Sequence, residues 1–207
     1  MQERQAFDYP NPQMGLVLQH FYEDNSQVVD RAGTEFFNYV QAVQEKVAKE
    51  KIEQLFNEWF VYDFKLKTGK TPLETYVHRN PDDLNEHDLD LMKQAGENNF
   101  TGYFWIEKVD AKTQLLIIRE CNTNTSYSVR DVTASQSVQS NAGLVAARLI
   151  QLDGEWYFAS DPIYFFPASA STTKDGGQNF IDVVKLHYGL WTAPGQEGAP
   201  AGTEAQC

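Results

Sequence analysis

The residues that could contribute to a binding site are most concentrated in the stretch EWFVYDFKLKTGKTPLETYV. Trp59 and Tyr62 place large rings at the end of a predicted helix, and Asp63 follows them as a lone carboxylate. Such rings either fill a junction between two subdomains or line a groove in which the carboxylate is the polar contact. Packing is the commoner role, and both interpretations stay open. Together with Trp105 and Trp156 from later segments, these residues form the predicted binding surface.

A second constellation consists of two aspartates and a histidine in the acidic segment PDDLNEHDLDLM. Asp83, His87 and Asp90 have the spacing i, i+4, i+7, which places them on one face of a continuous helix. Carboxylate and imidazole ligands suit a divalent metal such as Mn²⁺ or Zn²⁺, so a metal-dependent hydrolase is one alternative function. The same acids in a first helical turn also interact favourably with the helix dipole. We favour the dipole interpretation and predict no metal or cofactor.

Three arginines offer a third possibility, which is nucleic-acid binding. Arg119, Arg130 and Arg148 lie in three different predicted strands, beside aromatic residues that could stack on bases. Within 100–167, however, 5 basic residues are outnumbered by 7 acidic ones, and no basic groove is evident. A nucleic-acid-binding barrel is therefore an alternative that predicts converging arginines and binding that falls steeply with salt.

Sequence motifs of the common catalytic classes are absent. The chain has no G-x-S-x-G, phosphate-binding loop, G-x-G-x-x-G or HExxH motif, and its 4 histidines are scattered. Its 2 cysteines, Cys121 and Cys207, predict neither a disulfide framework nor a zinc site. A catalytic constellation can still assemble in space, but the sequence favours a non-catalytic protein.

The composition is that of a folded acidic protein. Of its 207 residues, 42% are hydrophobic and 13% are aromatic, and the net charge is −12. The first 99 residues hold 18 acids and 10 bases, a net charge of −8. This charge disfavours nonspecific binding to nucleic acid and to anionic membranes. Without a basic leader or an apolar run of about 18 residues, we expect a cytoplasmic protein of bacterial type with no membrane partner.

Helices are the first of the two kinds of element that must position these residues. Residues 1–14, with two prolines, are expected to be irregular, and an apolar period near 3.6 begins at about residue 27. Thr71 and Glu74 then form a capping box, with a proline at the first helical position. Asn85 is the predicted cap of a further helix.

Short segments rich in β-branched and aromatic residues follow residue 99, with turn residues about every 8–12 positions. An Asp-Gly pair at 153–154 predicts a hairpin between two of them. Closure of so small a sheet would protect its edges. The predicted fold class is α+β, with a helical region at 1–99 and a small antiparallel β-barrel of about five strands at 100–167. A linker and C-terminal helix at 168–192 and a disordered tail at 193–207 complete the prediction.

The run FNEWFVYDFKLKTGKTPLETYV resembles a segment of uncharacterised bacterial proteins. In that group a helix ends in W-F-x-[FY]-D, a basic turn follows, a T-P-[LI]-E-x-[FY] helix begins, and a small β-barrel tends to come next. Some members carry a C-terminal SEC-C zinc motif, from which this chain departs because its tail holds only Cys207. The resemblance covers about 55–167 and implies architecture alone, since the group has no activity to transfer.

These observations together predict a non-catalytic cytoplasmic protein-binding or adaptor module with an unknown protein partner. Aromatic residues near the junction of helices and barrel would form its binding surface. The alternatives are the nucleic-acid-binding barrel and the metal-dependent hydrolase.

Overall fold

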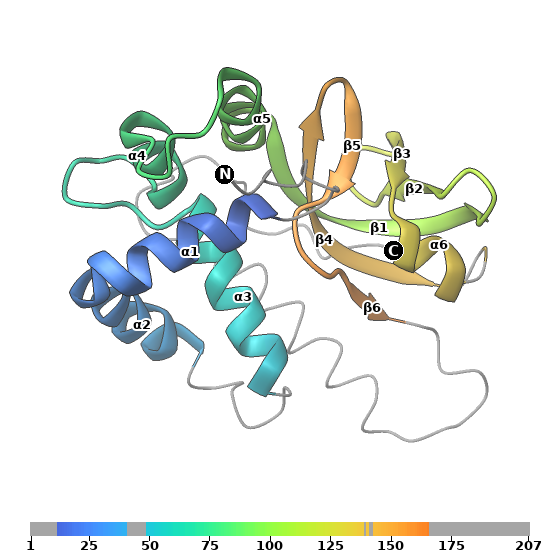
Figure 1. Cartoon of the computed structure of the whole chain (residues 1–207). Helices are drawn as coiled ribbons and strands as arrows, with labels where there is room; N and C mark the ends of the chain where they lie inside the picture. The colour runs from blue at the N-terminus through green and yellow to red at the C-terminus, as the bar shows by residue number, and fades with distance from the viewer. Residues whose placement is uncertain (1–11, 41–48, 139, 141–142, 166–207) are drawn as a thin grey trace.

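Most of the helices occupy one side of the molecule, and the strands and one short helix occupy the other (Figure 1). The computed structural model describes residues 12–40, 49–138, 140 and 143–165. Within them, five helices precede six strands, and one short helix lies among the strands. The mixed class of helices followed by sheet is therefore confirmed. The predicted linker, C-terminal helix and tail lie outside the described residues.

Five helices form the helical layer. They are α1 (Pro12–Asp24), α2 (Ser26–Val40), α3 (Lys49–Tyr62), α4 (Pro72–Arg79) and α5 (Glu86–Glu97). α1 was not predicted from the sequence, because the prolines near its start indicated irregular structure. Proline is tolerated in a first helical turn, where its missing N–H has no intrahelical partner to lose. Val17 and Phe21, spaced i and i+4, give α1 its buried face.

The predicted starts of α4 and α5 are confirmed by their caps. At α4 the Thr71 hydroxyl accepts the Glu74 N–H at 3.1 Å, and the Glu74 carboxylate accepts the Thr71 N–H. At α5 the Asn85 side chain accepts the Asp88 N–H at 2.9 Å. Each contact satisfies a backbone donor that the start of a helix leaves free. The local sequence therefore decides where these two helices begin.

Six strands and a short helix make up the rest of the described chain. They are β1 (Asn99–Asp110), β2 (Leu115–Glu120), β3 (Ser126–Arg130), α6 (Val132–Ser137), β4 (Leu144–Leu152), β5 (Glu155–Phe158) and β6 (Ile163–Phe165). The strand order is β1-β2-β3-β5-β4-β6, and β1 also pairs with β4. The pairings of β1 to β5 thus return to their starting strand, and β6 extends the sheet from β4.

The prediction of a purely antiparallel sheet is wrong at one pair. β3 and β5 run parallel, with Val129 opposite Trp156 and Arg130 opposite Tyr157. All other pairs are antiparallel. The reason is topological: strand directions cannot alternate all the way round a circuit with an odd number of strands. A circuit of five strands must therefore contain at least one parallel pair.

The predicted hairpin at the Asp-Gly pair is confirmed as the turn between β4 and β5. Asp153 and Gly154 both have positive φ angles, 49° and 81°. Two such residues between antiparallel strands match the twist of the strands, and Asp-Gly is one of the preferred pairs for this turn. Leu152 pairs with Glu155 directly beside it, which sets the register of the hairpin.

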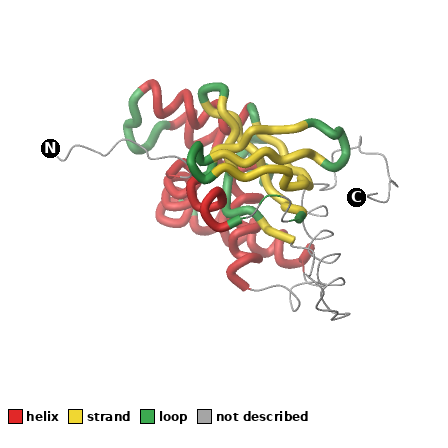
Figure 2. The backbone as a smooth tube through the Cα atoms, turned by 90° about the vertical axis from the view of Figure 1, so that its right-hand side faces the viewer, coloured by secondary structure: helices red, strands yellow, loops and turns green. Residues whose placement is uncertain are grey.

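Two hydrophobic clusters lie on opposite faces of β4. The larger one packs helical side chains such as Phe60 against Ile150 and Leu152 of the sheet. The second joins Leu149 to Phe104 and other strand residues. Neighbouring residues of a strand point to opposite faces, so Leu149 and Ile150 serve different clusters. Figure 2 shows the helices gathered against one side of the strands, where the larger cluster lies.

Candidate functional site

A buried arginine joins the helices to the sheet. Arg148 lies at the centre of β4, and its side chain is only 3% exposed. Its Nε donates to Glu58 Oε1 at 3.3 Å, and its Nη2 donates to Asp63 Oδ2. Its Nη1 donates to the Asn99 side chain at the start of β1. One guanidinium therefore holds the end of α3 against two neighbouring strands.

The neutral side chains of Tyr62 and Ser160 complete this network. We call it the Arg148 cluster, and it consists of Glu58, Tyr62, Asp63, Asn99, Arg148 and Ser160. The Tyr62 ring lies under the guanidinium, with a distance of 4.9 Å from its centroid to Arg148 Cζ. The Ser160 hydroxyl, which follows β5, donates to Glu58 Oε2. Gln54 Nε2 on α3 donates to Ser160 Oγ at 3.4 Å. The cluster thus brings together four segments that are distant in sequence.

Burial sets the ionisation properties of the cluster. It raises the pKa of the Asp63 carboxyl above its ordinary value, because the ionised form loses its hydration, and the attraction of Arg148 opposes this shift. Burial also raises the pKa of the Tyr62 phenol strongly, so the phenol stays protonated at neutral pH. Glu58 is 4% exposed and adjoins the guanidinium directly.

The chemistry available to the Arg148 cluster is limited by the pairing of its groups. Ser160 and Glu58 have the hydroxyl–carboxylate contact of a nucleophile and a general base. The Glu58 carboxylate is already engaged by the Arg148 guanidinium through Oε1, however. The side chains of Glu58 and Arg148 are also 4% and 3% exposed, so a substrate cannot reach them. The geometry supports a structural role at the junction.

The structure separates the five residues of the predicted aromatic surface. Trp59 is buried at 5% exposure among rings of the larger cluster, and Tyr62 and Asp63 belong to the Arg148 cluster. Trp105 packs against a third small cluster, and Trp156 against the strand cluster. These side chains lie on three different hydrophobic clusters, because successive strand positions alternate between faces. They do not share one exposed surface.

The three arginines of the nucleic-acid alternative are each paired with carboxylates. Arg119 Nε donates to Glu107 Oε1 at 2.6 Å, and Arg130 donates through Nε and Nη2 to both Glu155 oxygens at 2.9 Å. Arg148 is buried, as described above. Arg119 and Arg130 also stand at opposite ends of the β2–β3 ladder. The predicted convergence of these arginines is therefore not found.

The structure does not place Asp83, His87 and Asp90 on one helical face. α5 begins at Glu86, and Asp83 lies before it in a turn with a positive φ of 51°. Residues spaced i, i+4 and i+7 share one face only in a continuous helix, and the turn at Asp83 interrupts the helix here. Among the described residues, no group of three or more His, Cys, Asp or Glu side chains could hold a metal ion.

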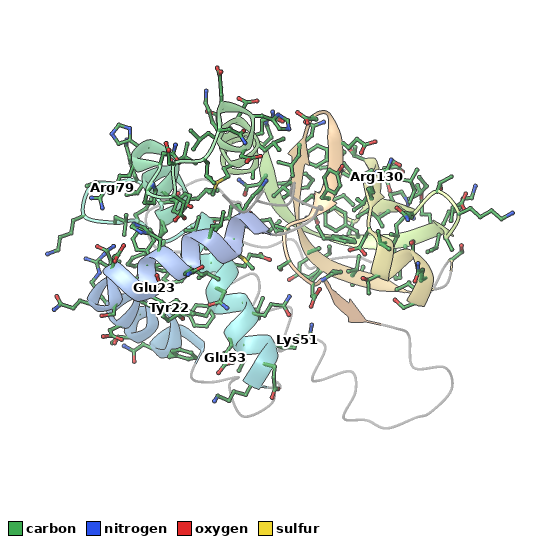
Figure 3. All side chains as sticks on the ribbon, in the orientation of Figure 1. Tyr22, Glu23, Lys51, Glu53, Arg79 and Arg130 are labelled. Atoms are coloured by element: carbon green, nitrogen blue, oxygen red, sulfur yellow. The ribbon has the colours of Figure 1, made fainter. Side chains whose placement is uncertain are left out.

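An exposed aromatic residue on α1 was missed by the sequence analysis. Tyr22 is 50% exposed, and it and Val132 are the exposed large hydrophobic residues of the described chain. Burial, and then the carboxylates of Glu53 on α3 and Asp30 on α2, raise the pKa of the Tyr22 phenol. Figure 3 shows Tyr22 and Glu23 on α1 near Glu53. Tyr22 follows the buried Phe21, so recognition of α1 as amphipathic would have indicated its exposure.

Comparison with known proteins found no match: no family model, no curated protein and no solved structure is significantly similar to this chain. The resemblance to uncharacterised bacterial proteins thus stays a prediction. No described helix combines the length and apolar character needed to span a membrane.

Proposed function

We propose that this chain is a non-catalytic protein-binding or adaptor module that binds its partner through the helical layer. The binding surface, which we call the Tyr22 face, consists of Tyr22 and Glu23 on α1 and Glu53 on α3, which Figure 3 labels, together with Asp30 on α2. The observation that carries the proposal is the half-exposed Tyr22 ring, at 50%, beside carboxylates from neighbouring helices. Trp59 and Tyr62, which were expected to bind at the helix–sheet junction, are buried in the larger cluster.

The chemistry of the Tyr22 face fits a partner segment rich in lysine or arginine. A cation over an exposed aromatic ring gains about 0.5–1 kcal/mol. Asp30 and Glu53 add negative charge near the ring, although Glu53 already pairs with Lys49 at 3.4 Å. Tyrosine is also enriched at protein interfaces. The first 99 residues carry a net charge of −8, which steers a cationic partner towards this half of the molecule.

The two alternative functions receive less support. A nucleic-acid-binding surface needs basic residues that are free to contact phosphates, and Arg119 and Arg130 are paired with Glu107 and Glu155. A metal-dependent hydrolase needs ligands that converge, and Asp83 lies in the turn before α5. The nucleic-acid function remains an outcome that the pull-down described below can detect.

We also propose that the strands form a small barrel and that the protein is cytoplasmic. The closed circuit of β1 to β5 is a small barrel around the strand cluster, and it serves as a rigid support for the helical layer. The proposed location is the cytoplasm of a bacterial cell, which the acidic composition supports.

The experiment measures binding of fluorescent Lys/Arg-rich peptides to the purified full chain by anisotropy, with Glu-substituted peptides of the same length for comparison. We expect the cationic peptides to bind and added salt to weaken them. Tyr22→Ala and Glu53→Gln should each weaken binding roughly 2- to 5-fold. Val132→Ala, which truncates the exposed hydrophobic residue of α6, is the matched control and should bind as the wild type does.

Two results would overturn this proposal. One is the absence of binding by every cationic peptide, and the other is equal binding by the wild type and Tyr22→Ala. A pull-down from bacterial lysate with and without nuclease separates the alternatives. Partners that all disappear on nuclease treatment would favour the nucleic-acid function.

A further inference from the structure

The charges of the Arg148 cluster do not balance when both carboxyl groups are ionised. Arg148 supplies one positive charge, whereas Glu58 and Asp63 supply two negative charges. The side chains of Arg148 and Glu58 are 3% and 4% exposed, and that of Asp63 is 30% exposed. An uncompensated charge at a buried site costs free energy, because the protein interior solvates it poorly.

Among the residues that the structure describes, the side chains around the cluster do not supply a full second positive charge. From α3 and the strands, Tyr62 and Asn99 contribute neutral groups to the guanidinium. Lys65, which follows α3, acts on Asp63 from a distance, and its ammonium pairs with Glu74 at 3.6 Å. On α2, the guanidinium of Arg31 lies 5.0 Å from the centroid of the Phe64 ring.

The two carboxyl groups differ in how well they can lose their charge. Glu58 lies deeper, and its two carboxylate oxygens accept hydrogen bonds from Arg148 and Ser160. Asp63 lies at the end of α3 and shares the same guanidinium through Nη2. A protonated Asp63 still accepts that hydrogen bond through its carbonyl oxygen. A proton on Asp63 therefore neutralises the excess charge without breaking a contact of Arg148.

We propose that Asp63 takes up a proton when α3 docks on β4. The contact between the helices and the sheet then depends on protonation and becomes more stable as the pH falls. The proton is the second positive charge of the Arg148 cluster. Glu58 and Arg148 form the buried ion pair of this cluster. The docked state then binds one more proton than the undocked state, so the population of the undocked state rises with the pH.

The direction of the pH dependence follows from the state in which Asp63 holds its proton more tightly. Burial raises the pKa of Asp63 in the folded protein above 3.8, the ordinary value for the unfolded chain. The stability contributed by this proton is fully present below 3.8 and is lost as the pH rises through the folded-state pKa. Carboxylates that are stabilised by pairing behave in the opposite way, because acid protonates them and removes their contacts.

The direct test is an NMR titration of the Asp63 carboxyl carbon in the full chain, with Asp63→Asn used to assign its signal. We expect a midpoint above 3.8. A midpoint at or below 3.8 would overturn the proposal, because the attraction of Arg148 would then outweigh the cost of burial. If Asp63→Asn does not fold, assignment through the backbone of the wild-type protein still gives the midpoint.

The second test compares the free energies of unfolding of the wild type and Asp63→Asn, measured with urea between about pH 4 and pH 7. We expect Asp63→Asn to gain stability relative to the wild type as the pH rises, because it never carries the excess charge. A relative gain by the wild type contradicts the proposal. Asp90→Asn, which removes an exposed carboxylate from α5, is the control and should not reproduce the relative gain. The measurement needs no partner, so its outcome is independent of binding at the Tyr22 face.

Discussion

Arg148 on β4 and Glu58 on α3 are 90 positions apart in the sequence and form a buried ion pair, with Arg148 Nε 3.3 Å from Glu58 Oε1. The pair crosses the boundary between the helical layer and the sheet. Asp63 meets the same guanidinium from the end of the same helix. The orientation of α3 on the sheet therefore depends on a polar cluster as well as on the hydrophobic contacts around it.

Arg148→Met should destabilise the protein by about 3–5 kcal/mol, because it leaves buried carboxylates without their positive partner. The loss should shrink on acidification, since a proton on Asp63 then removes one of the unpaired negative charges. Urea unfolding at neutral and mildly acidic pH measures both effects. Arg130→Met removes the exposed pair with Glu155 and serves as the control, with a much smaller loss expected. Similar losses for the two variants would contradict the importance of burial.

Trp59→Ala should cost about 3–5 kcal/mol, because the side chain is buried in the larger hydrophobic cluster. The Trp59 ring lies 5.5 Å from that of Phe36 and 5.3 Å from that of Phe64, measured between centroids. Its truncation leaves a cavity between α2 and α3. Thermal or urea unfolding provides the measurement, and Tyr22→Ala is the exposed control. A loss below about 1 kcal/mol would show that Trp59 is a surface contact.

Gly102→Ala should destabilise the sheet by about 1–3 kcal/mol, because the new methyl group has no space. A Cβ at Gly102 would lie 2.9 Å from Phe104 Cζ, and the Phe104 ring is fully buried and cannot easily move away. Gly15→Ala is the matched control in α1, where nothing lies within 4 Å of the added atom. That change should stabilise the helix by about 0.5–1 kcal/mol. Opposite signs in urea unfolding would confirm the prediction.

Thr71→Ala should cost about 1 kcal/mol, because it removes the side-chain acceptor at the start of α4. Thr71→Ser keeps the hydroxyl and should retain most of the stability. Unfolding in urea distinguishes the two variants, and equal losses would indicate that packing of the threonine methyl group matters more than the cap.

Glu74 should show the opposite pH dependence to Asp63. Partial burial opposes the shift, but the hydrogen bonds with Thr71 and the proximity of Lys65 lower the pKa of the Glu74 carboxyl. The stability that it contributes is present above the ordinary value of 4.5 and is lost as the pH falls through the lower folded-state pKa. Glu74→Gln should therefore lose its disadvantage relative to the wild type in acid. A disadvantage that grows in acid would contradict this assignment.

Part of the candidate site could be predicted from spacing, but its partners could not. Glu58 lies three positions after the buried Leu55 and four before Tyr62, so the helical period indicates a carboxylate on the buried face of α3. Asp63 and Arg148 were each predicted as site residues from the sequence, but they were assigned to different sites. Their contact joins α3 to β4, and no local pattern records that pairing.

The sequence by itself determined the features that depend on a few neighbouring residues. The caps at Thr71 and Asn85 and the turn at Asp153 are set by hydrogen bonds and backbone angles within a short segment. The tertiary structure alone decided the parallel β3–β5 pair, because strand directions depend on how the whole circuit closes. It also decided the burial of Arg148, because the segments that surround its side chain become neighbours only when the chain has folded.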